Sequence, residues 1–251
     1  FLQALIAYAK RVKNDLLYSM ALGYISPAVR FLPARPDGLE HALWQLVTGG
    51  ITPGRRLQAF RQYVSLAESE QAAAQLYQIW EKRELEGKPL SERDEINLSY
   101  QLAIRLPEKA DEIVNEQLKR ISNPDRQAEY RFISPSVSPR KEVRDSVFEA
   151  LLVADNRRIE PWASTALSLL NHRLRETESV EYIRPALEIL EEVQRTGDIF
   201  FPTAWLRALL GGHSSVQARD EVEAFYAEYP DFPEMLLNKI RQQADHLYRL
   251  H

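Results

Sequence analysis

The chain has no cysteine among its 251 residues, and none of its apolar runs is long. Without cysteine it can form neither a disulfide nor a thiolate metal site, and it cannot use a thiol nucleophile. A membrane-spanning helix needs roughly 18 consecutive apolar residues, and no run approaches that length. Strict alternation of apolar and polar residues over the length of a strand is also missing. These absences exclude disulfide scaffolds and predict neither a membrane span nor a β-rich fold.

The short motifs that reveal many enzymes are absent as well. The sequence contains no P-loop, no GxGxxG and no GxSxG. Its five histidines never form HExxH, in which two histidines one helical turn apart hold zinc beside a glutamate base. His172 and Glu176 have the spacing of two ligands, but no third ligand is evident. We therefore predict no catalytic residue and no metal site in this chain.

Charge is distributed unevenly along the sequence. The formal net charge is −4, which argues against a general nucleic-acid binder. Residues 1–63 hold 8 Lys or Arg against 3 Asp or Glu, whereas residues 176–234 hold 4 against 13. The simpler interpretation is that these charges lie on solvated helix faces. The alternative is a basic face and an acidic face that meet different partners.

Helical spacing of apolar residues runs through the whole chain. After Pro107, for example, Ala110, Ile113 and Val114 begin one apolar stripe. The segment 91–106 carries two stripes, which is typical of a helix packed between neighbours. Short turns between such segments favour antiparallel packing, although no repeat of fixed length is visible. We predict an all-α fold, an irregular HEAT-like or armadillo-like superhelix of antiparallel helix pairs, in a single domain over residues 1–251.

Several helix ends can be placed from local signals. Ser91 with Asp94, and Ser214 with Gln217, resemble capping boxes. Gly197 is expected to end a helix that begins near Val180. Pro233 is expected to start the last helix. The polar segment 84–89 is interpreted as a turn, not as a domain linker.

The stretch RTGDIFFPTAW at residues 195–205 combines a glycine, a proline, three consecutive large apolar residues and a tryptophan. Asp198 is a plausible helix cap in front of Pro202. We expect Ile199, Phe200 and Phe201 to pack between successive helical layers. The alternative is that one phenylalanine faces a cavity or another domain.

Residues 155–214 carry an ordered series of motifs. They are N-R-x-x-E-P-W at 156–162, L-N-H-x-L-R at 170–175, Y-I-R-P-A-L-E at 182–188, Q-R-T-G-D-I-F-F-P at 194–202 and G-H-S at 212–214. In order and spacing, this stretch resembles the C-terminal helical domain of zinc aminopeptidases of the aminopeptidase N family, in the form found in Bacteroidetes-type bacteria. Arg173 departs from the family pattern, which has proline there. Outside this stretch the chain resembles that domain only in length and helicity.

The resemblance implies a role without catalysis. In that family the zinc, the HExxH motif and the residues that bind the peptide's free amine lie in other domains, and the helical domain closes over them. The expected partners are then the catalytic domain of the same polypeptide and peptide substrates, with no nucleic acid and no membrane. Zinc belongs to the full-length enzyme and not to this chain. Since the sequence opens at Phe1 inside a helical pattern, we expect a segment of a longer protein or a processed product.

Arg157 and Arg158 are the candidate peptide-binding residues. They are adjacent in a short turn between two helices, and arginine binds a carboxylate through two parallel hydrogen bonds. Such a pair suits the C-terminus of a peptide, and we expect the Arg157 side chain to be exposed. The structural alternative is solvation of a helix end, or an ion pair with Asp155 or Glu160. Trp162, at helical spacing with apolar residues, is expected in the core and not as a stacking platform.

Two other functions are compatible with the sequence. One is a HEAT-like scaffold for protein–protein interaction with no link to peptidase activity, for which the acidic region 176–234 would suit a basic partner. The other is a helical-repeat nucleic-acid enzyme, with the basic region 1–63 on phosphate.

Overall fold

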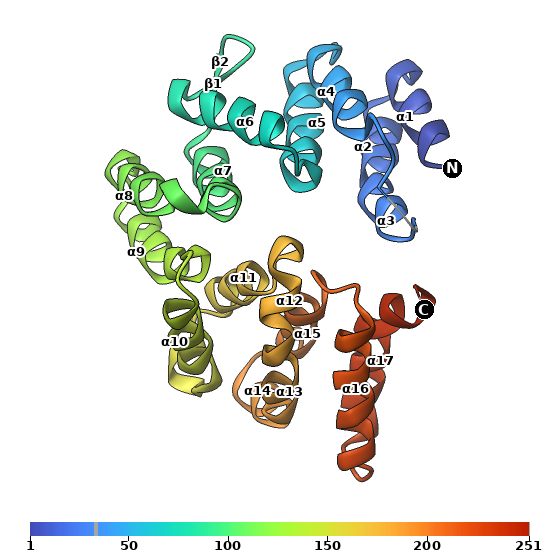
Figure 1. The fold of residues 1–251 in the computed structure, drawn as a ribbon, viewed down its shortest axis with the longest axis vertical. Coiled ribbons are helices and arrows are strands. Elements are labelled where there is room, and N and C mark those ends of the chain that lie inside the picture. The colour runs from blue at the N-terminus through green and yellow to red at the C-terminus, as the bar shows by residue number, and fades with distance from the viewer. Residues whose placement is uncertain (33–34, 251) are drawn as a thin grey trace. The chain divides into compact units, whose positions relative to one another are not determined.

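The computed structural model describes residues 1–32 and 35–250. Almost every element in this part of the chain is helical, and the elements form two compact units, unit 1 (Phe1–Arg105) and unit 2 (Leu106–His251) (Figure 1). The all-α, repeat-like prediction is confirmed: consecutive helices pack against each other as pairs in each unit. None of the described helices is both long and apolar enough to cross a membrane. The single domain over residues 1–251 stays a prediction, because packing within each unit does not say whether both unfold together.

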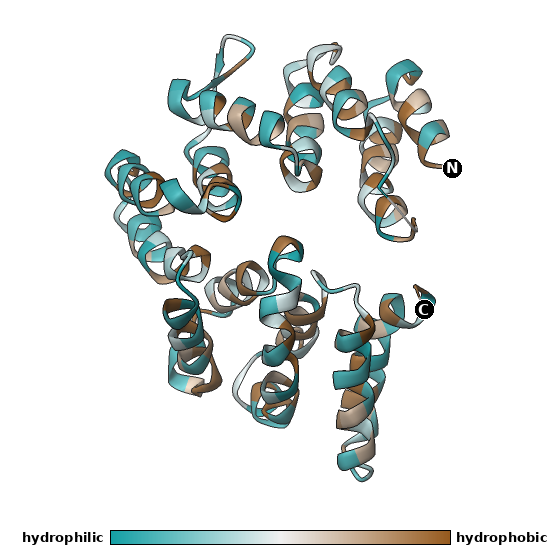
Figure 2. Ribbon diagram, in the orientation of Figure 1, coloured by the Kyte–Doolittle hydropathy of each residue, from teal (hydrophilic) through white to brown (hydrophobic). Residues whose placement is uncertain are grey.

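Unit 1 is built from paired helices and one short hairpin. Its described elements are α1 (Leu2–Arg11), α2 (Asp15–Gly23), α3 (Ile25–Arg30), α4 (Leu39–Thr48), α5 (Pro53–Leu66), α6 (Glu70–Lys82), β1 (Glu84–Leu85), β2 (Lys88–Pro89) and α7 (Glu92–Arg105). Most helices carry hydrophobic residues on one side and hydrophilic residues on the other (Figure 2). Helices α4 and α5 pack along each other extensively, and α6 packs on α7.

The helix ends of unit 1 follow from local chemistry. The Thr52 and Ser69 side chains accept hydrogen bonds from backbone N–H groups in the first turns of α5 and α6. Ser91 Oγ likewise accepts from Asp94 N at 3.2 Å, as its spacing predicts. The predicted turn at 84–89 is a hairpin whose two central residues, Glu86 and Gly87, both have positive φ. This hairpin connects α6 to α7 without interrupting their packing.

Unit 2 contains more short 3₁₀-helical turns than unit 1 does. Its described elements are η1 (Pro107–Lys109), α8 (Ala110–Arg120), α9 (Pro124–Ile133), η2 (Ser134–Val137), α10 (Lys141–Leu152), η3 (Ala154–Arg157), α11 (Glu160–Leu170), η4 (Arg173–Arg175), α12 (Glu176–Ser179), η5 (Val180–Tyr182), α13 (Ile183–Glu188), α14 (Leu190–Thr196), α15 (Phe201–Leu210), α16 (Val216–Glu228) and α17 (Glu234–Arg249). Pro233 precedes α17 and Gly197 ends α14, both as predicted.

Two local predictions in unit 2 need correction. The helix expected from Val180 to Gly197 is divided into η5, α13 and α14, with a break at Ile189. The cap of α16 is Ser215, whose Oγ accepts from Ala218 N, and not Ser214. Only Ser214 has a glutamine three residues later, but its side chain is engaged in a tertiary contact with Glu176, and Ser215 caps the helix instead.

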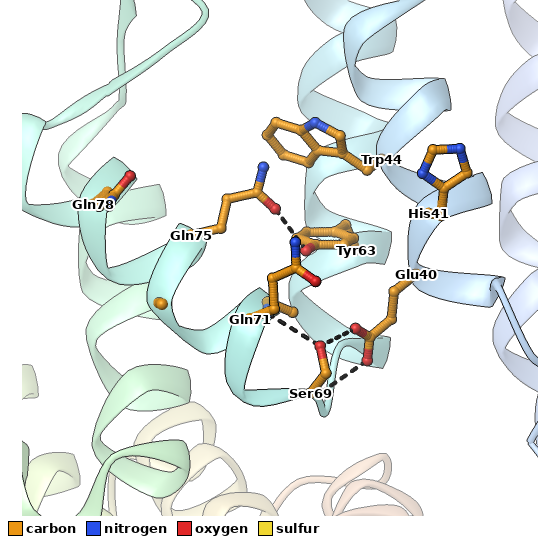
Figure 3. Close-up of a pocket in the computed structure, with 10 residues that line it drawn as sticks. Glu40, His41, Trp44, Tyr63, Ser69, Gln71, Gln75 and Gln78 are labelled. Carbon is orange, nitrogen blue, oxygen red and sulfur yellow. Dashed lines mark hydrogen bonds between the residues drawn. The ribbon is translucent and has the colours of Figure 1, made fainter.

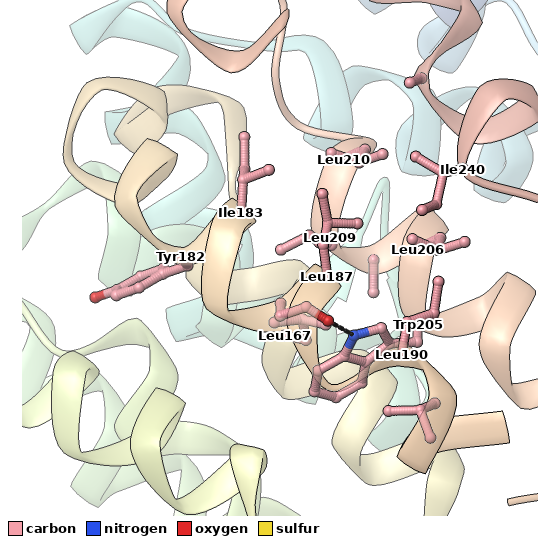
Figure 4. Packing of buried hydrophobic residues seen from close by; sticks show 14 of the residues in the cluster. Leu167, Tyr182, Ile183, Leu187, Leu190, Trp205, Leu206, Leu209, Leu210 and Ile240 are labelled. Atoms are coloured by element: carbon pink, nitrogen blue, oxygen red, sulfur yellow. Dashed lines mark hydrogen bonds between the residues drawn. The ribbon is translucent and has the colours of Figure 1, made fainter. Parts of the chain in front are cut away.

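The core of unit 2 is a continuous apolar cluster contributed mainly by α11, α13, α14, α15, α16 and α17. Trp205 is fully buried there, and its indole Nε1 donates to the main-chain oxygen of Ala186 at 3.1 Å (Figure 4). The same layer includes Leu167, Leu190 and Leu206. Burying an aromatic ring with its one polar group satisfied makes this tryptophan the anchor between α13 and α15.

Candidate functional site

Arg157 is buried, with 2% of its surface exposed. Its Nη1 donates to the main-chain oxygen of Leu151 at 2.6 Å, and its guanidinium lies 5.5 Å from the centre of the Trp205 ring. Nη2 lies 3.2 Å from Glu192 Oε1, an ion pair without good hydrogen-bond geometry. Burial lowers the pKa of Arg157, and Glu192 partly offsets that effect. The view of Arg157 as an exposed residue is therefore wrong, since the side chain ties η3 to α14 and α15.

Arg158 has the opposite environment. Its side chain is 76% exposed, and Nη2 donates to Asp155 Oδ1 at 2.8 Å, one of the ion pairs considered from the sequence. The two neighbouring arginines thus do not share a site. Arg158 is the one whose guanidinium is accessible, and its peptide-binding role stays a prediction.

The turn that holds Arg158 lies beside the turn at residues 197–200. Glu160 Oε1 accepts a hydrogen bond from Asp198 N at 2.8 Å, which joins the two turns. Ile159, Ile199 and Phe200 are exposed there, and we call these three residues the 159/200 patch. Exposed apolar side chains beside an accessible arginine have the composition of a contact surface.

Only one of the three apolar residues at 199–201 packs in the core. Phe201 is 2% exposed, whereas Phe200 is 72% exposed and Ile199 is more exposed still. Asp198 makes the contacts expected of a cap, since its Oδ1 accepts from Phe200 N and Phe201 N at 2.7 and 2.8 Å, although the N-cap position of α15 is Phe200. The prediction of interlayer packing is confirmed for Phe201 and wrong for Ile199 and Phe200. Of the three residues, only Phe201 belongs to α15, and it faces the core from the first position of that helix.

Two motifs of the segment 155–214 meet in a buried contact. His213 Nε2 is 2.9 Å from Asn171 Oδ1, and His246 Nε2 is 3.0 Å from the His213 main-chain oxygen. A Cβ on Gly212 would stand 1.8 Å from the Asn171 main-chain oxygen, so only glycine fits. Burial lowers the pKa of His213 to about 4. Asn171, Gly212 and His213 are therefore structural residues that lock the start of η4 to the end of α15.

Glu176 extends this contact. Its carboxylate accepts hydrogen bonds from Ser214 N, Ser214 Oγ and Ser215 N at 2.5, 2.9 and 2.6 Å. Burial raises the pKa of Glu176, but the hydrogen bonds from the two serines outweigh that effect and lower it. Oε1 lies 3.9 Å from His213 Nδ1. The carboxylate holds the turn before α16, which explains why Ser215 rather than Ser214 caps that helix.

Trp162 is half-buried and packs on Phe132, with ring centres 5.8 Å apart.

Within residues 1–32 and 35–250, no group of three His, Cys, Asp or Glu side chains could hold a metal ion. The expectation that zinc binds elsewhere in the full-length enzyme stays a prediction.

Unit 1 contains a pocket that the sequence did not reveal (Figure 3). It has a volume of about 530 Å³ and lies between α4, α5 and α6. The lining residues are Glu40, His41, Trp44, Tyr63, Ser69, Gln71, Ala72, Ala74, Gln75 and Gln78. The three glutamines follow the spacing i, i+4, i+7 along α6, which places them on one helix face. The sequence therefore signals a shared amide face on α6, but not that this face meets Trp44 and Tyr63 in a pocket.

Aromatic and amide groups dominate this pocket. The rings of Trp44 and Tyr63 are tilted by 55° with centres 5.2 Å apart. Tyr63 Oη donates to Gln75 Oε1 at 2.8 Å. Burial, and secondly the charge of Glu40, raise the pKa of Tyr63 to about 12, so the hydroxyl stays protonated as a donor. The arrangement is a fixed aromatic wall facing amide groups.

A second pocket in unit 1, of about 470 Å³, is basic. Lys10, Arg11, Lys13 and Arg55 contribute to its lining, without an acidic side chain. Arg55 is occupied: its Nη1 and Nη2 donate to the main-chain oxygens of Val12 and Lys13, and its Nε donates to Asp15. These contacts fix the turn between α1 and α2, so Arg55 is a structural residue.

No family model matches the chain, and neither a curated protein nor a solved structure does.

Proposed function

We propose that this chain is the non-catalytic C-terminal helical domain of a zinc-dependent aminopeptidase, where it closes over the active site and helps to bind peptides. The observation that supports this role is that the motifs of residues 155–214 contact one another within unit 2. Glu160 of the first motif meets Asp198 of the fourth, and Asn171 of the second motif meets His213 of the fifth. Motif residues that contact one another in this way stabilise the fold of unit 2, as expected of a domain that covers an active site and does not catalyse the reaction.

The contact surface in this proposal is the 159/200 patch together with Arg158. Apolar side chains held at a rigid, capped turn can cover a neighbouring domain, and the adjacent guanidinium can bind a peptide's terminal carboxylate. This chain supplies no zinc ligand in the proposal. The metal and the peptide-bond chemistry belong to another domain of the polypeptide.

The test begins with the full-length gene. We expect an HExxH motif and a third glutamate ligand upstream of Phe1, and zinc-dependent release of N-terminal amino acids by the full-length protein. Arg158→Ala should lower kcat/KM roughly tenfold to a hundredfold on a free tetrapeptide, because one charge-assisted contact contributes about 1.5–3 kcal/mol. The loss should vanish on the tetrapeptide amide, which lacks the carboxylate.

Arg207→Ala is the matched control, because Arg207 is an exposed arginine on α15 of the same unit. It should leave both substrates unaffected. Equal losses of Arg158→Ala on the tetrapeptide and its amide would remove Arg158 from the site. A full-length gene without any HExxH would refute the peptidase proposal as a whole.

A scaffold for protein–protein interaction is the second candidate. Leu16, Met20 and Tyr24, at successive steps of four residues, are exposed along α2 and its C-terminal cap. Such an apolar helix face favours contact with another polypeptide. A partner that stays bound to the full-length protein in the absence of peptidase activity would support the scaffold.

A further inference from the structure

The pocket between α4, α5 and α6 of unit 1 has the chemistry of a ligand site, independently of the proposed peptidase role. It is bordered by the half-buried indole of Trp44 and by amide groups on a single face of α6 (Figure 3). Tyr63 holds the Trp44 indole and the Gln75 amide in position, because its ring contacts Trp44 and its hydroxyl donates a hydrogen bond to Gln75. The aromatic surface is therefore set in position before any ligand arrives.

The pocket offers almost no free charge. Glu40 is the only carboxylate among the described lining residues, and it accepts hydrogen bonds from Glu68 N at 2.6 Å, Ser69 N at 3.0 Å and the Ser69 hydroxyl. Arg35 lies 3.5 Å from the same carboxylate. No Lys or Arg is among the lining residues. A carboxylate that caps the start of α6 and faces an arginine attracts cations weakly, so an ionic ligand is disfavoured.

The remaining polar groups suit a ligand that both donates and accepts hydrogen bonds. Each glutamine amide carries one acceptor oxygen and two donor hydrogens. Gln71 and Gln78 are exposed at the pocket, while Gln75 uses its oxygen for Tyr63 and keeps its amide nitrogen as a donor. His41 Nε2 is 2.7 Å from Gln45 Nε2. For Gln45 to donate there, the proton of a neutral His41 must be on Nδ1, which adds one more donor.

We propose that this pocket binds a pyranose ring of a neutral carbohydrate. A pyranose has a face of C–H groups that can pack on the Trp44 indole, and a rim of hydroxyls that both donate and accept. The rim matches the amides of Gln71, Gln75 and Gln78, and the uncharged ring matches a pocket whose carboxylate, Glu40, is already engaged by hydrogen bonds. An aromatic ring with convergent amide groups thus selects for a neutral, hydroxylated ligand.

The proposal is tested by isothermal titration of the chain with three neutral tetrasaccharides: maltotetraose, cellotetraose and tetra-N-acetylchitotetraose. At least one should bind, with an affinity that does not change between low and high salt. Trp44→Ala should raise its dissociation constant about tenfold or more, which corresponds to roughly 1.4 kcal/mol. Trp44→Phe, which keeps an aromatic face, should retain most of the affinity.

Trp162→Ala is the matched control, because Trp162 is a half-buried tryptophan in unit 2, outside this pocket. It should leave binding unchanged. Circular dichroism of each variant checks that the helices are intact. The proposal is overturned if none of the three saccharides binds, or if Trp44→Ala and Trp162→Ala behave alike. It is also overturned if tetra-alanine amide binds in a Trp44-dependent manner while the saccharides do not, because the site would then be a peptide site.

Discussion

In unit 2, the buried Arg157 and His213 contact main-chain oxygens, carboxylates or amides of the same unit. In unit 1, by contrast, the half-buried Trp44 and the glutamines of α6 border open space. The polar groups of unit 2 hold its turns together, whereas those around the pocket leave hydrogen-bonding capacity for a ligand. The comparison teaches that a polar side chain at a helix end is structural when its partners lie within the unit. It can serve binding only when some of its donors or acceptors stay unused.

The largest effect is expected at the Phe200–Phe201 pair. Phe201→Ala should lower the free energy of unfolding by roughly 3–5 kcal/mol, because it removes a buried ring. Phe200→Ala should change it by less than about 0.5 kcal/mol, because that ring lies at the surface. Urea unfolding of both variants measures the difference. Equal urea midpoints for the two variants would contradict the assignment of Phe201 to the core of unit 2 and of Phe200 to the surface.

The second effect concerns pH. The pKa of His213 is about 4 in the folded chain, below its ordinary value of about 6.5. Between these values the unfolded chain binds a proton that the folded chain does not, so stability falls as the pH is lowered from 6.5. The slope should reach about 1.4 kcal/mol per pH unit.

Urea unfolding between pH 7 and 5 measures the slope, and His213→Gln should flatten it. Glu176, whose pKa is lowered, contributes in the same direction but only at more acidic pH. An unchanged slope in His213→Gln would show that His213 is not the group that titrates.

A smaller effect is expected at the adjacent arginines. Arg157→Ala should lower the free energy of unfolding by about 1–3 kcal/mol, because it leaves Glu192 and the Leu151 oxygen without their partner. Arg158→Ala should stay within about 0.5 kcal/mol, as for other exposed positions. Thermal and urea unfolding should agree on this order. The reverse order would contradict the buried environment of Arg157.

The smallest effect is expected in the pocket of unit 1. Tyr63→Phe removes the hydrogen bond to Gln75 and should cost only about 0.5–1.5 kcal/mol. The same substitution should weaken saccharide binding, since it releases the Gln75 amide from its fixed orientation. If Tyr63→Phe strongly destabilised the chain but left saccharide binding unchanged, the Tyr63–Gln75 contact would be structural, like the buried contacts of unit 2.

Local spacing predicted a good part of this molecule. The position of Gly197 at a helix end, the Asp198 cap and the burial of Phe201 all follow from residues within about one helical turn. The same reasoning placed Ile199 and Phe200 in the core and Arg157 at the surface, and failed at all three. In a turn, successive side chains point in directions that no periodicity fixes, so neighbouring residues of the same type can have opposite environments.

The sequence by itself determined that the fold class is all-α, where many helices begin and end, and that thiol chemistry is excluded. Those properties depend on residue identity and on contacts between positions a few residues apart. Only the tertiary structure decided that Arg157 meets Glu192, that Asn171 meets His213, and that the α6 glutamines face Trp44. These partners lie roughly 30–40 positions apart along the chain, and packing of whole helices brings them together. No local pattern encodes contacts over such a separation in sequence. The buried contacts of unit 2 and the pocket of unit 1 therefore appear only in the folded chain.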